Sequence, residues 1–139
     1  MSFSLIRKTD PNLVDVRSNY KKIAEELMTQ YYNLYDADFP SLARMYHPES
    51  QFTYRDNEFY GFPKLLSLIK DTYRVYKFTH SVVHLTVQPI NRTDLLIMTH
   101  GLLSINNSTH SDKFIETLVI RRDDSNQFCI ISTIFKLVE

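Results

Sequence analysis

The spacing of the apolar residues changes once along this chain of 139 residues. Between residues 18 and 37 they recur with the period of a helix, and Ile23, Leu27, Tyr31 and Leu34 fall on one stripe. From residue 78 onward, apolar and polar side chains alternate with the period of a strand. Helices followed by a run of strands predict an α+β domain whose helices pack on one side of an antiparallel sheet.

The chain is short enough for one globular domain. Residues 1–17 have no clean period and contain Pro11, so they are predicted to be an N-terminal extension to a domain at 18–139. The following segments are predicted within it: helices starting near residues 18, 38 and 61, a short strand at 51–54, a turn at 55–57, and strands at 78–87, 95–104, 113–122 and 127–137.

Composition argues against several classes of function. Sixteen basic and sixteen acidic residues cancel and form no basic run, so direct binding to nucleic acid is not expected. Gly61 and Gly101 are the only glycines, and no glycine-rich phosphate loop can be written from them. The first twenty residues lack an apolar stretch typical of a signal peptide or membrane span, which favours the cytosol or nucleus and no membrane partner. Cys129 stands alone, so no disulfide forms within the chain.

The stretch from Tyr20 to Gly61, with its QYYNLYDAD and EFYG segments, resembles the nuclear transport factor 2 family. The resemblance continues in Gly101-Leu102-Leu103, in Phe114-x-x-Thr-Leu, and in the closing Ile134-Phe135-Lys136-Leu137. It implies a cone of three N-terminal helices packed on a strongly curved antiparallel sheet. The cone mouth of such a fold binds a protein loop or a small molecule, and its sheet face meets a partner subunit.

One branch of this family imports the small GTPase Ran in its GDP form, using an aromatic mouth and an acidic rim. The resemblance places Tyr54 at the aromatic position, Arg55 where the family has Glu, and Asn106 and Ser108 where it has an acidic pair. These four residues are the predicted cone-mouth binding residues. Because like charges facing each other cost several kcal/mol at an interface, Ran carriage is the alternative rather than the preferred function.

A second branch is the small subunit of the mRNA export receptor, which pairs through its sheet face with a larger homologous subunit. Lys136 matches a basic residue of that interface, although an ammonium cannot form the fork of a guanidinium. Tyr20 matches an aromatic residue that takes up Phe-Gly nucleoporin repeats in the import branch. The resemblance therefore implies a homodimer or heterodimer located in the nucleus, in the cytoplasm and at the nuclear pore.

The alternation in the last strands supports such an interface, because both faces carry large apolar groups and the helices can cover only one. The set on the other face is Ile115, Val119, Ile131, Phe135 and Leu137. We assign the dimer interface to Phe114, Leu118, Ile120, Phe128, Ile130, Ile134 and Lys136.

The same fold also hosts isomerases and dehydratases, so a small-molecule or enzymatic role is a second alternative. It would need a tyrosine or histidine beside a carboxylate, and the candidates are Tyr31, Tyr54, His84, His100 and Asp56. Aromatic helix stripes ordinarily pack in the core. His80 and His84 on one strand would lie about 13 Å apart, too far to share a metal ion. We therefore predict a non-enzymatic adaptor in nucleocytoplasmic transport, with no catalytic residue, metal or cofactor.

Overall fold

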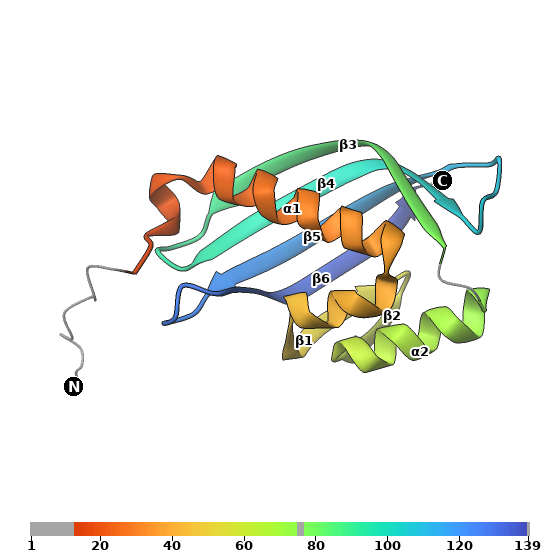
Figure 1. Cartoon of the computed structure of the whole chain (residues 1–139), viewed down its shortest axis with the longest axis horizontal. Coiled ribbons are helices and arrows are strands. Elements are labelled where there is room, and N and C mark those ends of the chain that lie inside the picture. The colour runs from red at the N-terminus through yellow and green to blue at the C-terminus, as the bar shows by residue number, and fades with distance from the viewer. Residues whose placement is uncertain (1–12, 75–76, 139) are drawn as a thin grey trace.

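The computed structural model describes residues 13–74 and 77–138 (Figure 1). It confirms the predicted order of three main helices followed by long strands, with a short helical turn, η1, before the first. The helices are η1 (Val16–Ser18), α1 (Tyr20–Ala37), η2 (Phe39–Met45) and α2 (Phe62–Tyr73). The strands are β1 (Tyr46–Tyr54), β2 (Asn57–Tyr60), β3 (Phe78–Pro89), β4 (Asp94–Ile105), β5 (Asp112–Arg122) and β6 (Phe128–Val138).

The strands form one curved sheet of six in the order β2-β1-β6-β5-β4-β3. The prediction of a purely antiparallel sheet is wrong, because β1 pairs with β6 in parallel. Parallel neighbours need a long connection between them, and here it consists of β2, α2 and β3 to β5. The period of a strand gives its alternating faces but not the direction of its neighbour, so the sequence pattern could not reveal this pairing.

The helices lie on one side of the sheet. In Figure 1, α1 crosses in front of the long strands, while η2 and α2 lie beside β1 and β2. The face beneath α1 is called the inner face, and the opposite face, which carries no helix among the described residues, the outer face. The helix α1 buries one stripe of side chains against the inner face, including Met28, Tyr31 and Tyr35. Within residues 13–74 and 77–138, no helix is both long and apolar enough to cross a membrane.

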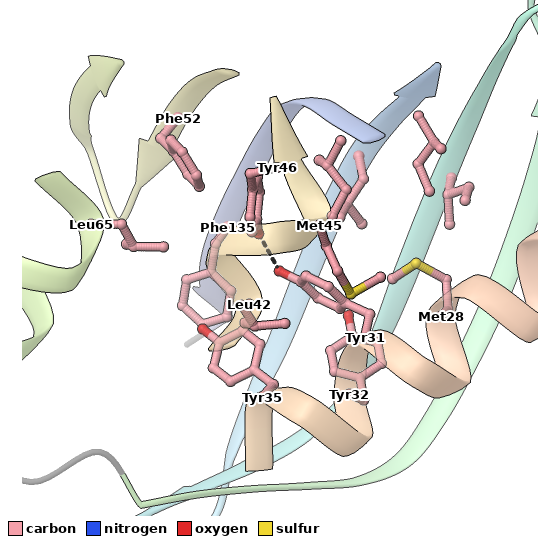
Figure 2. Close-up of a cluster of buried hydrophobic side chains, with 14 of the residues drawn as sticks. Met28, Tyr31, Tyr32, Tyr35, Leu42, Met45, Tyr46, Phe52, Leu65 and Phe135 are labelled. Carbon is pink, nitrogen blue, oxygen red and sulfur yellow. Dashed lines mark hydrogen bonds between the residues drawn. The ribbon is translucent and has the colours of Figure 1, made fainter. Parts of the chain in front are cut away.

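Aromatic side chains dominate the core between the helices and the sheet (Figure 2). Tyr31, Tyr35 and Tyr46 are buried with Phe52 and Phe135. Tyr31 meets Tyr35 and Tyr46 edge-to-face, and the rings of Tyr46 and Phe52 are tilted against each other. Such rings bury large apolar areas and still offer hydroxyl groups for hydrogen bonds. The interior is therefore well packed and at the same time partly polar.

The described part of the predicted extension packs against the ends of the long strands. Val16 is fully buried, and its N–H donates to the carbonyl of Arg92 at 3.0 Å. The Val14 carbonyl accepts from the Arg122 guanidinium at 2.8 Å. These contacts lie at the β3–β4 and β5–β6 ends of the sheet rather than on its outer face. The division at residues 17 and 18 stays a prediction, and residues 1–12 lie outside the described part.

Candidate functional site

The cone mouth is formed by the turn between β1 and β2, the end of α2, and the loop between β4 and β5. Two of the predicted mouth residues converge on Tyr73 from opposite sides. The Arg55 guanidinium donates to the Tyr73 hydroxyl at 3.0 Å, and the Asn106 side-chain amide donates to the Tyr73 carbonyl at 3.3 Å. The Asn106 N–H also donates to the Lys77 carbonyl at 2.7 Å. Arg55 and Asn106 therefore link the rim segments to one another.

Tyr54 forms the inner wall of the mouth rather than an exposed aromatic surface. Its side chain is 5% exposed and stacks on Phe135, with ring centroids 4.8 Å apart. The turn that follows has positive φ angles at Arg55 (48°) and Asp56 (78°), an uncommon conformation for residues other than glycine. The turn brings the Arg55 guanidinium to the Tyr73 hydroxyl, while Tyr54 itself is buried; its role in binding stays a prediction.

Ser108 stabilises its own loop. Its carbonyl accepts from the Ser104 hydroxyl at 2.7 Å, and its hydroxyl accepts from the His110 N–H at 3.1 Å. Near the mouth, a small hollow of about 160 Å³ is lined by Arg55, Asp56, Lys136 and Leu137. With two cations and one carboxylate, this hollow does not form an acidic rim.

Tyr20 is the first residue of α1 and is half-buried against the core. In Figure 1, α1 begins near the N-terminal end of the described chain and runs toward η2, so Tyr20 lies at the opposite end of the helix from the mouth. A peptide bound at Tyr20 would therefore use a surface separate from the mouth.

The outer face is apolar and its side chains lie in rows across the strands. One row contains Thr86, Met98, Thr117 and Ile134, because these residues pair in register across β3 to β6. The exposed apolar residues of this face on β4 to β6 are 37–45% exposed, and they are Leu96, Met98, Ile115, Ile134 and Val138. The structure therefore has the exposed apolar sheet face that the alternation of side chains in the last strands predicts.

The residues assigned to that face need correction. Phe114, Leu118, Ile120 and Ile130 are 0–2% exposed and lie in the core, so they cannot present side chains to a partner. Phe128 is half-buried and packs against the core. Of the predicted interface set, Ile134 and Lys136 are exposed on the outer face.

A register shift explains part of this misassignment. Val119 pairs with Ser132, but Ile120 pairs with Ile130, so β6 has an irregularity at this point. The irregularity reverses which residues of β6 point inward: Ile130 is buried, whereas Ile134 is exposed despite its even spacing from Ile130. Strict alternation places both on one face.

A buried polar network inside the cone was not predicted as a unit. Glu116 on β5 accepts from the Tyr31 hydroxyl at 3.0 Å and from the Tyr32 hydroxyl at 2.7 Å. The hydroxyls of Tyr31 and Tyr46 lie 2.6 Å apart (Figure 2), and Tyr32 lies 2.6 Å from the Thr99 hydroxyl. We call these five residues the tyrosine–glutamate network. The sequence signal for it was a charged residue in a strand at a position whose neighbours on the same face of the strand are apolar.

Burial sets the ionisation of this network. It raises the pKa of the Glu116 carboxyl, while hydrogen bonds from Tyr32 and Tyr31 act in the opposite direction. Burial, followed by the nearby Glu116 charge, also raises the pKa of Tyr31 and Tyr32 well above its usual value. The two tyrosines therefore remain protonated near neutral pH and donate to the carboxyl.

A second polar contact ties the end of α1 to β3. Asp36 accepts from the His80 backbone N–H at 2.9 Å, and its other oxygen lies 2.6 Å from His80 Nδ1. The His80 ring packs among Tyr32, Tyr35 and Phe114, with centroids 4.5–5.2 Å apart. Asp36 is therefore the hydrogen-bond partner of this buried histidine.

These groups have the composition of an acid–base site but are mutually bonded and enclosed by aromatic rings. General acid–base chemistry requires a substrate within hydrogen-bond reach. Here the Glu116 oxygens are each bonded to a tyrosine, and the His80 imidazole is surrounded by rings, with its Nε2 atom buried and unpaired among the described residues. Among the residues that the structure describes, no three His, Cys, Asp or Glu side chains gather as a metal site.

Comparison with known proteins identifies relatives along most of the chain. A family model of the nuclear transport factor 2 (NTF2) domain matches residues 23–137. Nuclear transport factor 2 of Saccharomyces cerevisiae is 27% identical over 124 residues, which cover 86% of this chain and 94% of that protein.

Solved structures extend the likeness at lower identity. Nuclear transport factor 2 from Cryptosporidium parvum is similar with a TM-score of 0.75 and 18% identity, covering 93% of this chain and all (100%) of the other. Yeast Bre5, described as a Ubp3-associated protein, has a TM-score of 0.68 and 18% identity, covering 87% and 98% of the two chains. Similar structures also include a proposed ketosteroid isomerase from Parabacteroides distasonis, with a TM-score of 0.66, 18% identity and 94% coverage of each chain. At this identity the likeness shows the fold alone.

Proposed function

This chain belongs to the nuclear transport factor 2 family, and from that premise we propose that it is a non-enzymatic, protein-binding adaptor in nucleocytoplasmic transport. We propose that it works like the small subunit of an mRNA export receptor: it would pair through the outer face of its sheet with a homologous NTF2-like subunit. It would then act in the nucleus and the cytoplasm and at the nuclear pore. Tyr20 is the proposed contact for Phe-Gly nucleoporin repeats.

The exposed apolar side chains of the outer face carry this proposal. Met98, Ile115 and Ile134 come from three adjacent strands and face water without a helix above them. Contiguous apolar surface of this kind is typical of a protein interface. Bre5, which shares the fold, is described as a cofactor in a complex with the deubiquitinase Ubp3, and this supports an adaptor role for such a domain.

The mouth supports pairing through the sheet more than it supports carriage of Ran. Tyr54 is buried and stacked on Phe135, and the adjacent Arg55 donates a hydrogen bond to Tyr73. A partner loop entering here would meet a cation and would have to displace this hydrogen bond. The rim also lacks carboxylates at Asn106 and Ser108, where attraction to a basic partner would arise.

The interior supports a non-enzymatic role. Each carboxyl oxygen of Glu116 accepts a hydrogen bond from a tyrosine, and the Nδ1 atom of His80 is bound by Asp36. A catalytic carboxyl would need to face a substrate rather than the core. The likeness to a proposed isomerase is a likeness of fold, which does not carry activity.

Light scattering of the purified chain, alone and with candidate export subunits, tests the proposal. We expect pairing to be lost in Ile134→Glu, because a charge would be placed in an apolar interface. The matched control is Ile90→Glu, since Ile90 is equally apolar and exposed but lies beyond the end of β3. A wild-type chain that stays monomeric with every candidate partner, or pairing that survives Ile134→Glu, would contradict the proposal.

Ran import is the second candidate, because the resemblance to the nuclear transport factor 2 family includes a branch that imports Ran-GDP. A pull-down with Ran-GDP at physiological salt separates the two functions. The proposal expects no retention of Ran-GDP by the wild-type chain. It also expects Arg55→Glu, which restores an acidic rim residue, to increase retention. Tight retention by the wild type would favour import and overturn the argument from Arg55, Asn106 and Ser108.

A further inference from the structure

The outer face carries a hollow of about 440 Å³ near the ends of β4, β5 and β6. We call it the outer-face hollow. The side chains that define it are His84, His100, Leu102, Lys113, Ile115 and Val138. A volume of this order accommodates a small ligand or one large side chain rather than a folded element.

The strand register explains how these side chains come together. His84 pairs with His100, which pairs with Ile115, so the three form one row across β3, β4 and β5. Leu102, Lys113 and Val138 form the next row across β4, β5 and β6. Both rows belong to the set of positions that points away from α1. The hollow is therefore built from hydrogen-bonded strands, and β3 has an irregularity between Ser81 and His84 at its border.

Its chemistry is apolar with a basic edge. Leu102, Ile115 and Val138 supply the apolar surface, and the last two are 39% and 41% exposed. The His84 and His100 rings stack at one side, with centroids 5.0 Å apart and planes 18° apart. Lys113 also lines the hollow and is exposed, and none of the described residues lining the hollow is acidic.

Carboxylates near the hollow in sequence are directed elsewhere. Glu116 faces the inner side, where each of its carboxyl oxygens accepts a hydrogen bond from a tyrosine. Asp112 lies on the same side of β5 as Glu116 and contacts His110 at 2.9 Å. Asp56 contacts Lys136 at 3.7 Å and lies beside the mouth, not the hollow. Among the described residues, none that lines the hollow supplies an anion, and Glu25 lines a neighbouring hollow with His84.

We propose that the outer-face hollow is a binding site for an apolar group that carries a carboxylate, presented by the polypeptide that pairs with the outer face. Such a group would be an aromatic or large aliphatic side chain next to an aspartate or glutamate. The apolar part would bury against Leu102, Ile115 and Val138, and the carboxylate would meet Lys113 and the imidazoles. The identity of the polypeptide that presents this group rests on the proposed function. The chemical class of the bound group does not, because it follows from the residues that line the hollow.

The chemistry can be tested with a small probe, 4-phenylbutyrate, titrated into the isotope-labelled full chain and followed by amide chemical shifts. We expect saturable shifts confined to residues 84, 100–102, 113–115 and 138, with a Kd of roughly millimolar order for so small a ligand. The neutral alcohol and the amine with the same phenylbutyl group should bind at least about threefold more weakly, because they lack the charge that Lys113 attracts.

Matched lysine variants localise the site. Lys113→Gln should weaken binding of 4-phenylbutyrate by about threefold or more, whereas Lys64→Gln, on the exposed side of α2, should leave it unchanged. Ile115→Ser should weaken the acid and the alcohol together, because it removes apolar surface from the hollow.

Three results would overturn the inference: no saturable shift at these residues, equal binding of acid and amine, or equal effects of the two lysine variants. These results are separate from those for the proposed function. Probe binding by a chain that pairs with no partner would leave the carboxylate site standing and remove the adaptor. The chain could instead form a dimer by itself in which the probe does not bind and Lys113→Gln does not change the dimerisation. A second copy would then occupy the hollow without using its lysine, and the inference would be wrong.

Discussion

Glu116 is the residue whose chemistry is most changed by folding. Its carboxyl is enclosed by the core, and only the hydrogen bonds from Tyr31 and Tyr32 offset the loss of water. Because burial raises its pKa, the folded state holds the proton more tightly than the unfolded state does. The free energy of unfolding contributed by Glu116 is therefore greatest below the ordinary pKa of about 4.5 and falls as pH rises through the raised value.

Replacing Glu116 with glutamine removes this pH dependence while keeping the size of the side chain. We expect the free energy of unfolding of Glu116→Gln to gain on that of the wild type as pH rises from about 4.5 toward neutrality. Urea titrations over a pH series measure the difference. Glu58→Gln, on the exposed strand β2, is the control. Parallel curves for wild type and Glu116→Gln would show that the carboxyl is not buried as described.

Tyr31 joins two other members of the tyrosine–glutamate network through one hydroxyl. In Tyr31→Phe, Tyr46 and Glu116 each lose a hydrogen-bond partner inside the core. We expect a loss of about 1–3 kcal/mol in the free energy of unfolding, measured by chemical denaturation. Tyr60→Phe removes the same hydroxyl from an exposed side chain and should change stability by less than about 0.5 kcal/mol. Equal effects of the two variants would contradict the network.

At the scale of elements, the position of the turn between β1 and β2 can be predicted from the sequence, but its residue types are unfavourable for the backbone conformation that it adopts. A two-residue turn joins Tyr54 to Asn57, and both of its residues have positive φ. Glycine or asparagine is usual in such a turn because a side chain there is crowded by the backbone. Arg55 and Asp56 occupy it instead, which brings the guanidinium to Tyr73 at the mouth.

Relieving this strain should stabilise the hairpin. We expect Asp56→Gly to raise the free energy of unfolding by about 0.5–1 kcal/mol, since its contact with Lys136 is exposed and contributes little. Asp56→Ala should lower it, because alanine has the crowding of a side chain without the local hydrogen bonding of aspartate. Chemical denaturation of the two variants gives both values. A stabilising alanine substitution would mean that the positive φ angle is not the source of the strain.

At the scale of the whole molecule, both faces of the sheet carry apolar side chains, but the inner face is buried and the outer face is exposed. Leu118 points to the inner face and is fully buried, whereas Met98 points to the outer face and is 45% exposed. We expect Leu118→Ala to lower the free energy of unfolding by about 2–5 kcal/mol, because it leaves a cavity in the core. Met98→Ala should change it by less than about 0.5 kcal/mol and should weaken pairing with a partner instead.

Urea denaturation and light scattering on the same two variants check this division. We expect the inner-face variant to lose stability and the outer-face variant to lose association. If Met98→Ala destabilised the isolated chain as much as Leu118→Ala, the outer face would be covered by the chain itself, and neither the adaptor nor the outer-face hollow would be available to a partner.

The sequence by itself determined the order of the three main helices and of every strand except β2, a turn after residue 54, and the family, because the period of the apolar residues and short motifs are local properties. Only the tertiary structure decided which sheet face is buried: alternation defines two sets, and the irregularity in β6 moves Ile130 and Ile134 to opposite faces. It likewise decided that β1 runs parallel to β6. The bonds of Glu116 to Tyr31 and Tyr32 join residues more than eighty positions apart, so packing alone brings them together.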